Sequence, residues 1–203
     1  MMFALSERAQ DFIARTQAFI QQEIEPIEKA FWDEVHQLNV DGDWTKWQWP
    51  AQLEQLKTKA KAAGLWNMFL PDTELGAGLS VQEYAHIAEL TGRSLLAPTV
   101  FNCNAPDSGN MELLWRYGSQ EQKQQWLQPL LNGDIRSVFC MTEPAVASSD
   151  ATNMQATAVV DGDEIVLNGR KWWSSGLGDP NAKIIIFMAY TPDSNKDRHH
   201  QHS

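Results

Sequence analysis

Apolar residues recur every three or four positions through the first two-thirds of the chain. The first such series comprises Phe12, Ile13, Thr16, Phe19, Ile20, Ile24 and Ile27. This spacing places the series on one face of a long helix, whose regular part Pro26 bends or ends. A second stripe, from Leu53 to Ala63, follows Pro50 and stops at Gly64, which predicts another helix.

Two capping boxes mark the starts of further helices. Ser80 is followed three residues later by Glu83, and Ser119 is followed by Gln122. In this pattern the two side chains bond backbone N–H groups that the first helical turn leaves free. Residues 105–117 are also predicted to be helical, so helices dominate the chain as far as residue 133.

Short apolar runs typical of strands begin after Gly133. Residues 137–141 and 182–190 are mostly apolar. Residues 157–167 contain two apolar segments separated by an Asp-Gly turn, the pattern of a β-hairpin. The second part of the chain is therefore predicted to be a sheet.

Together these patterns predict an α+β fold with two domains. Residues 1–135 are expected to form an all-helical N-terminal domain, and residues 136–203 the start of an antiparallel β-sheet domain. The polar residues 191–203 offer no further strand, which leaves the sheet with an open edge. We therefore expect the chain to be a fragment of a longer protein.

Composition narrows the class of protein. The 203 residues carry a net charge of −10, which argues against nucleic-acid binding. No apolar run approaches the roughly 20 residues that a membrane span needs, and the N-terminus lacks the features of a secretory signal. Two cysteines, Cys103 and Cys140, make no disulfide framework and fit a reducing compartment. A cytoplasmic protein is expected.

Two short segments carry a recognisable signature. Residues 139–150 read Phe-Cys-Met-Thr-Glu-Pro-Ala-Val-Ala-Ser-Ser-Asp, and residues 168–176 read Asn-Gly-Arg-Lys-Trp-Trp-Ser-Ser-Gly. Both segments, at this separation, resemble the flavin-facing motifs of the acyl-CoA dehydrogenase family, and the wording is closest to the branch of members 10 and 11. The helices before them also lie where that family has them.

The resemblance implies an FAD site. The residues it assigns to the cofactor are Phe139, Met141, Thr142, Ser149, Trp173, Ser174 and Ser175. A flavin ring needs a flat slot, hydrogen-bond partners along its polar edge and little competing water. Backbone groups of the first three residues would serve the pyrimidine edge, Trp173 would cover one end of the isoalloxazine, and the Ser175 hydroxyl would reach flavin N5.

Three further assignments follow from the same segments. Ser149 matches the serine that touches the acyl-CoA substrate, although Ser148 is an alternative because this chain is one residue longer here than the common motif. Trp172 is expected to enter the core. Glu143 is interpreted as a structural acid in a turn rather than a general base.

The implied reaction is the α,β-dehydrogenation of an acyl-CoA thioester, in which a carboxylate removes the α proton and the β hydrogen leaves as hydride to FAD N5. The resemblance puts the catalytic glutamate in a C-terminal domain beyond residue 203, so no catalytic residue is assigned and the chain alone is expected to be inactive. A full-length member is expected to be a homo-oligomer that passes electrons to an electron-transfer flavoprotein.

Two alternatives to this reading stay open. One is a non-catalytic helical module that binds acyl-CoA or a partner through Trp-rich surfaces. The other is a related flavoenzyme on the same scaffold, an acyl-CoA oxidase or a nitroalkane oxidase. No metal site is expected, because His199, His200 and His202 have no cysteine or ordered acid beside them.

Overall fold

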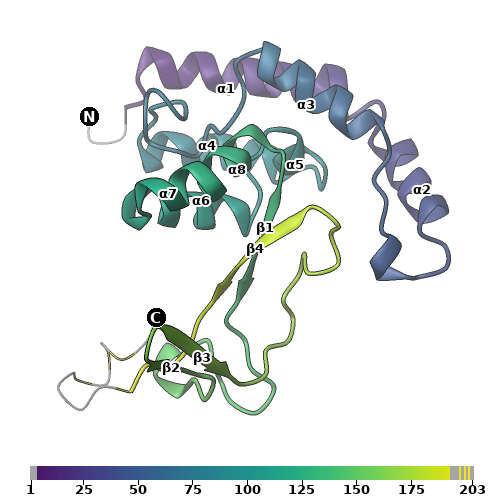
Figure 1. The fold of residues 1–203 in the computed structure, drawn as a ribbon. Coiled ribbons are helices and arrows are strands. Elements are labelled where there is room, and N and C mark those ends of the chain that lie inside the picture. Colours follow the sequence, from purple (N-terminus) through teal and green to yellow (C-terminus); the bar gives the residue numbers. More distant parts are fainter. Residues whose placement is uncertain (1–3, 193–196, 198, 200, 202–203) are drawn as a thin grey trace. The chain divides into compact units, whose positions relative to one another are not determined.

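The computed structural model describes residues 4–192, 197, 199 and 201 (Figure 1). The chain divides into two compact units, Met1–Asp134 and Ile135–Ser203. Among its described residues, the first unit contains only helices and loops, whereas the named strands all belong to the second. None of the described helices combines the length and the apolar character that a membrane span requires. The helices of the first unit and the strands of the second confirm the predicted α+β fold class.

The first unit is built from α-helices, two π turns and a short 3-10 helix. They are α1 (Glu7–Phe19), η1 (Ile20–Ile24), α2 (Glu28–Leu38), η2 (Trp44–Lys46), α3 (Gln52–Ala62), α4 (Val81–Thr91), α5 (Ala97–Val100), α6 (Asp107–Tyr117), α7 (Gln120–Gln122), η3 (Lys123–Leu127) and α8 (Gln128–Asn132). The predicted long helix forms as α1 and η1 and ends before Pro26. The segment from α7 to α8 stays helical through Pro129, because the π turn η3 ends two residues before that proline, which has no N–H to donate.

Both predicted capping boxes are present. Ser80 caps α4 with Glu83, and Ser119 caps α7 with Gln122, each with the reciprocal pair of hydrogen bonds. Ser6 caps α1 by accepting a hydrogen bond from the Ala9 N–H over 3.1 Å. These side chains satisfy N–H groups that a helix start would otherwise leave without a partner.

The core of this unit is formed where α1 packs on α4 and α3 packs on α5. Phe19 and Phe101 meet edge to face, with ring centroids 5.3 Å apart. Each large apolar side chain that is fully buried contributes about 1.5–3 kcal/mol. The largest such side chains are Phe31, Phe101, Ile24, Leu65, Met68, Leu70, Leu79, Ile87, Leu96 and Met111.

Four aromatic rings gather around helix α2 and the loop after it. Trp49 lies 6.5 Å from Phe31, 6.3 Å from Trp32 and 5.9 Å from Trp47, measured between ring centroids. The three tryptophans are only partly buried and pack against the hydrophobic core. These rings therefore contribute to the packing of the unit as well as to its surface.

In the part of the second unit that the structure describes, there are two pairs of strands. Its elements are β1 (Arg136–Cys140), η4 (Ala151–Asn153), β2 (Thr157–Asp161), β3 (Glu164–Asn168) and β4 (Ala182–Phe187). β2 and β3 pair in antiparallel register, and Gly162 takes a φ of 62° in the turn between them. The predicted hairpin is confirmed.

The other pair corrects the prediction of an antiparallel sheet. β1 and β4 run parallel and lie side by side, with Cys140 opposite Phe187 (Figure 1). Antiparallel neighbours are typically joined by a tight turn, whereas parallel strands need a long connection. Residues 141–181 provide such a connection. They contain the second flavin-like segment and all of the first except its two opening residues, which end β1. The long connection between the paired strands, which includes the β2–β3 hairpin, therefore begins at the end of β1.

Candidate functional site

A buried ion pair joins the two segments that the sequence singles out. Lys171 Nζ lies 2.9 Å from Glu143 Oε1, and the two side chains are 5% and 4% exposed. Glu143 follows β1 by three residues, and Lys171 follows β3 by the same number. A buried charge is stable only when it is paired and hydrogen-bonded, so this pair holds the two segments in contact.

The Glu143 carboxylate also binds two backbone groups. Oε2 accepts from the Gln155 N–H over 2.8 Å, and Oε1 accepts from the Ala156 N–H over 3.0 Å. Burial acts to raise the pKa of Glu143, but the hydrogen bonds from Lys171 and from these N–H groups outweigh it and lower the pKa. Glu143 is thus an ionised structural group, as interpreted from the sequence.

Further contacts bring the two segments into register. Lys171 Nζ donates to the Met141 carbonyl over 2.9 Å, and the Trp172 N–H donates to the Thr142 carbonyl over 3.0 Å. Lys171 Nζ also lies 5.1 Å from the centre of the Phe187 ring on β4. The stretches around Thr142 and Trp172 therefore lie side by side within the second unit.

Most of the side chains assigned to the cofactor lie at the surface of this unit. Phe139, Thr142, Trp173 and Ser175 are exposed. Met141 is half-buried, as is Ser174 in the second segment. The Trp173 backbone has a φ of 53°, the left-handed region that a bulky residue rarely adopts. Strain of this kind is often found at binding sites.

The expectation that Trp172 enters the core is wrong. Trp172 is 45% exposed, and its ring lies 5.5 Å from that of Trp173, which is 79% exposed. The buried side chain of this segment is that of Lys171, because its ammonium pairs with the buried Glu143 carboxylate. Both indole rings are consequently left at the surface.

The two adjacent serines have different surroundings. Ser148 is 2% exposed, and its Oγ accepts from the Glu143 N–H over 2.6 Å. Ser149 is exposed. The Ser148 hydroxyl is therefore committed to the loop, whereas the Ser149 hydroxyl is accessible to a ligand.

Sequence reasoning missed Lys171. No local signal could have found it, because its partner Glu143 is 28 residues away in the chain. Gly169 was missed as well: a Cβ at that position would lie 2.4 Å from the Ala156 Cβ. Only a glycine permits this close approach, which holds the second segment against residues 155–156.

The chemistry of this surface fits a flat heteroaromatic ligand. The two segments that form it carry the exposed residues Phe139, Thr142, Trp173 and Ser175, which supply two aromatic rings and two hydroxyl groups. Binding sites for such ligands combine apolar aromatic walls with a few placed polar groups. An isoalloxazine ring, apolar on its faces and polar along one edge, matches that combination.

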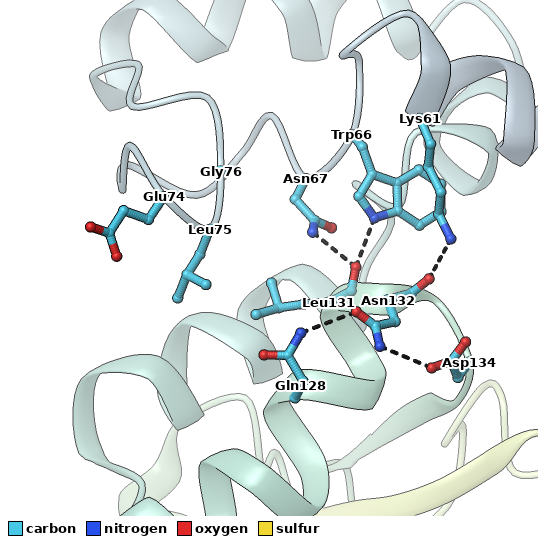
Figure 2. Close-up of a pocket in the computed structure, with 10 residues that line it drawn as sticks. All are labelled: Lys61, Trp66, Asn67, Glu74, Leu75, Gly76, Gln128, Leu131, Asn132 and Asp134. Carbon is cyan, nitrogen blue, oxygen red and sulfur yellow. Dashed lines mark hydrogen bonds between the residues drawn. The ribbon is translucent and has the colours of Figure 1, made fainter.

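A separate cavity of about 560 Å³ lies in the helical unit (Figure 2). Trp66 Nε1 and Asn67 Nδ2 both donate to the Leu131 carbonyl, over 2.7 and 3.0 Å, and Lys61 Nζ donates to the Asn132 carbonyl over 2.6 Å. The three donors converge on the last carbonyls of α8 in Figure 2. They cap a helix end that would otherwise lack partners.

Metal-ligand chemistry has no support in the part of the chain that the structure describes. No group of three or more His, Cys, Asp or Glu residues there could hold a metal ion. His200 and His202 lie outside the described residues.

Comparison with protein-family models gives two matches. The acyl-CoA dehydrogenase N-terminal domain matches residues 6–134, and the acyl-CoA dehydrogenase middle domain matches residues 138–203. The two flavin-like segments both fall within the second match.

Individual relatives agree with these matches. Acyl-CoA dehydrogenase family member 11 of Mus musculus is 51% identical over 202 residues, which is 100% of this chain and 25% of the relative. A solved structure from Mycobacterium abscessus, assigned to the acyl-CoA dehydrogenases, is 62% identical with a TM-score of 0.90 and covers 99% of this chain and 50% of its own. A glutaryl-CoA dehydrogenase from Mycobacterium smegmatis in complex with FADH2 shares the fold, with a TM-score of 0.64 at 24% identity over 93% of this chain and 44% of its own. The chain therefore spans a quarter to a half of the length of these proteins.

Proposed function

The chain belongs to the acyl-CoA dehydrogenase family, and from this premise we propose that residues 139–150 and 168–176 form one wall of the FAD site of such an enzyme. The observation that carries the proposal is the contact between the two segments, made by the Trp172–Thr142 hydrogen bond and the buried Lys171–Glu143 pair. FAD, when bound, supplies the acceptor for two electrons taken from the substrate.

Each residue of the wall has a distinct task in this proposal. The Thr142 N–H and hydroxyl donate to the polar edge of the ring system. The Trp173 indole covers one end of the ring and excludes water, and Phe139 provides an apolar edge. The Ser175 hydroxyl, with Ser174 beside it, binds near the reacting end of the ring. Met141 contributes backbone groups.

The substrate proposed for the whole protein is an acyl-CoA thioester, dehydrogenated between its α and β carbons. Ser149 is the proposed substrate contact, because its hydroxyl is accessible while that of Ser148 is held by the Glu143 N–H. The resemblance puts the base that removes the α proton outside these 203 residues. We therefore expect no turnover by the chain alone. An electron-transfer flavoprotein as acceptor, a homo-oligomeric assembly and a cytoplasmic location complete the proposal for the whole protein.

The test is a titration of the isotope-labelled 203-residue chain with FAD, followed by NMR. Weak binding is expected, with shifts concentrated at the amides of Thr142, Trp173 and Ser175 and at the Trp173 indole N–H. A Trp173→Ala variant should lose the response, while Tyr117→Ala, which removes an exposed ring from the helical unit, should keep it. Absence of these shifts at saturating FAD would contradict the proposal. Stoichiometric flavin with measurable dehydrogenation would contradict the expected lack of turnover by the chain alone.

The same titration with an acyl-CoA examines the rival function, a helical binding module. The rival is favoured if chemical-shift changes appear within residues 6–134 and none appears in the second unit. Under our proposal, the acyl-CoA should instead shift the NMR signals of Ser149 and its neighbours.

A further inference from the structure

We propose that Lys171 is a positioning residue for the flavin wall, because its ammonium orients and polarises the peptide group between Met141 and Thr142. This inference rests on the proposed function, in which that peptide faces the cofactor. It assigns to the buried cation a role beyond holding two segments together.

The contacts of the ammonium define the first step. Lys171 Nζ donates to the Met141 carbonyl oxygen over 2.9 Å and to Glu143 Oε1 over 2.9 Å, and it lies 3.9 Å from Met154 Sδ. The side chain is 5% exposed, so water competes little for these bonds. The Met141 carbonyl is thus bound by a buried positive charge.

The second step is the direction of the N–H in the same peptide group. In a trans peptide the C=O and N–H point to opposite sides. Because the Met141 carbonyl points at Lys171, the Thr142 N–H points away from the ammonium. Among the residues that the structure describes, none accepts a hydrogen bond from that N–H.

The next peptide group behaves differently. The Thr142 carbonyl accepts from the Trp172 N–H over 3.0 Å, and the Glu143 N–H donates to Ser148 Oγ over 2.6 Å. Both of its polar groups are therefore bound within the protein. The Thr142 N–H, by contrast, is left available to a ligand.

The third step is electrostatic. A donor with a full positive charge on the carbonyl withdraws electron density from the peptide and makes its N–H a stronger donor, because hydrogen bonds in series polarise one another. Glu143 balances the charge of Lys171 and anchors residues 155–156, so the cation stays buried. The arrangement strengthens the Thr142 N–H towards an acceptor such as a flavin carbonyl oxygen.

The experiment compares the wild-type chain with a variant that lacks the donor to the Met141 carbonyl. The double variant Glu143→Gln with Lys171→Met removes this donor and leaves neither a buried ammonium nor a buried carboxylate unpaired. Lys183→Met is the matched lysine control, since Lys183 donates to the Pro180 carbonyl at an exposed site. Lys171→Arg tests rescue by another cationic donor.

Two quantities are measured by NMR: the proton shift of the Thr142 amide without ligand, and the Kd for FAD. We expect the double variant to move the Thr142 amide proton upfield relative to the wild type. We also expect it to weaken FAD binding about tenfold, because the hydrogen bond from the Thr142 N–H to the ligand loses its charge assistance. Lys183→Met should change neither quantity, and Lys171→Arg should retain most of both.

A double variant that folds and matches the wild type in both quantities would overturn the inference. So would Lys171→Arg if it folds but behaves like the double variant. If the wild-type chain does not respond to FAD, the proposed function fails, while the ligand-free shift of the Thr142 amide still decides whether Lys171 polarises that peptide. The two failures are therefore separable.

Discussion

Ser6 and Glu83, 77 residues apart in the chain, link the first turns of helices α1 and α4. The Ser6 hydroxyl donates to Glu83 Oε1 over 2.6 Å, and the Ser6 N–H donates to the same oxygen over 3.3 Å. Glu83 Oε2 accepts from the N–H and hydroxyl of Ser80 in the capping box. One carboxylate thus serves two helix N-termini, where the helix dipoles favour negative charge.

The Glu83 link makes the stability of the helical unit depend on pH. The hydrogen bond from the Ser6 hydroxyl, followed by those from Ser80, lowers the pKa of Glu83 from 4.5 to about 2. A lowered pKa in the folded state stabilises the fold at pH values above 4.5, and that contribution is lost as the pH falls towards 2. Glu83→Gln should lower the Tm at pH 7, and the difference from wild type should shrink below pH 4.5.

Thermal unfolding followed by circular dichroism measures this effect. Glu89→Gln, which changes an exposed acid on the same helix, should leave the Tm and its pH dependence unchanged. A Glu83→Gln variant with the wild-type Tm at pH 7 would show that the link contributes nothing.

Asn102 should be sensitive to substitution. Its Nδ2 donates to Asn67 Oδ1 over 2.7 Å and to the Leu130 carbonyl over 2.9 Å, and the residue is buried. Asn102→Ala should destabilise the chain by about 2–4 kcal/mol, because it leaves buried acceptors without donors. Asn102 has a φ of 54°, so Asn102→Gly should cost about 1 kcal/mol less than alanine. Urea unfolding measures both, and equal losses would rule out a backbone contribution.

Two glycines should respond to alanine in opposite directions. A Cβ at Gly76 would lie 2.3 Å from the Leu70 carbonyl oxygen, whereas a Cβ at Gly109 would meet nothing within 4 Å. Gly76→Ala should destabilise by about 1–3 kcal/mol through backbone displacement. Gly109→Ala, inside α6, should stabilise by about 0.5–1 kcal/mol through helix propensity. Chemical denaturation measures the free energy of unfolding of both variants. A change of the same sign in both would contradict the geometry.

The two serines of the first motif should separate stability from binding. Ser148→Ala should destabilise the second unit by about 1–3 kcal/mol, since it leaves the buried Glu143 N–H without its acceptor. Ser149→Ala should keep the stability of the wild type and weaken the response to acyl-CoA. Hydrogen exchange of the Glu143 amide and acyl-CoA titration measure the two effects. A stability loss confined to Ser149→Ala would reverse the assignment.

Much of the helical unit could be predicted from the chain because its signals are local. The apolar spacing from Phe12 to Ile27 and the capping box at Ser80 involve residues within a few turns of each other. The Asp-Gly turn of the hairpin is equally local. Both flavin-like segments were recognised for the same reason, since each is a short contiguous motif.

The direction of the β1–β4 pair, the exposure of Trp172 and the role of Lys171 were decided by the tertiary structure. No turn links Cys140 to Ala182, so nothing local sets their relative direction. Lys171 is buried because Glu143, 28 residues away, balances its charge in a space that excludes water. Local sequence patterns indicate the secondary structure that a segment prefers. The burial of a side chain and the pairing of strands depend on groups distant in the chain, which only folding brings together.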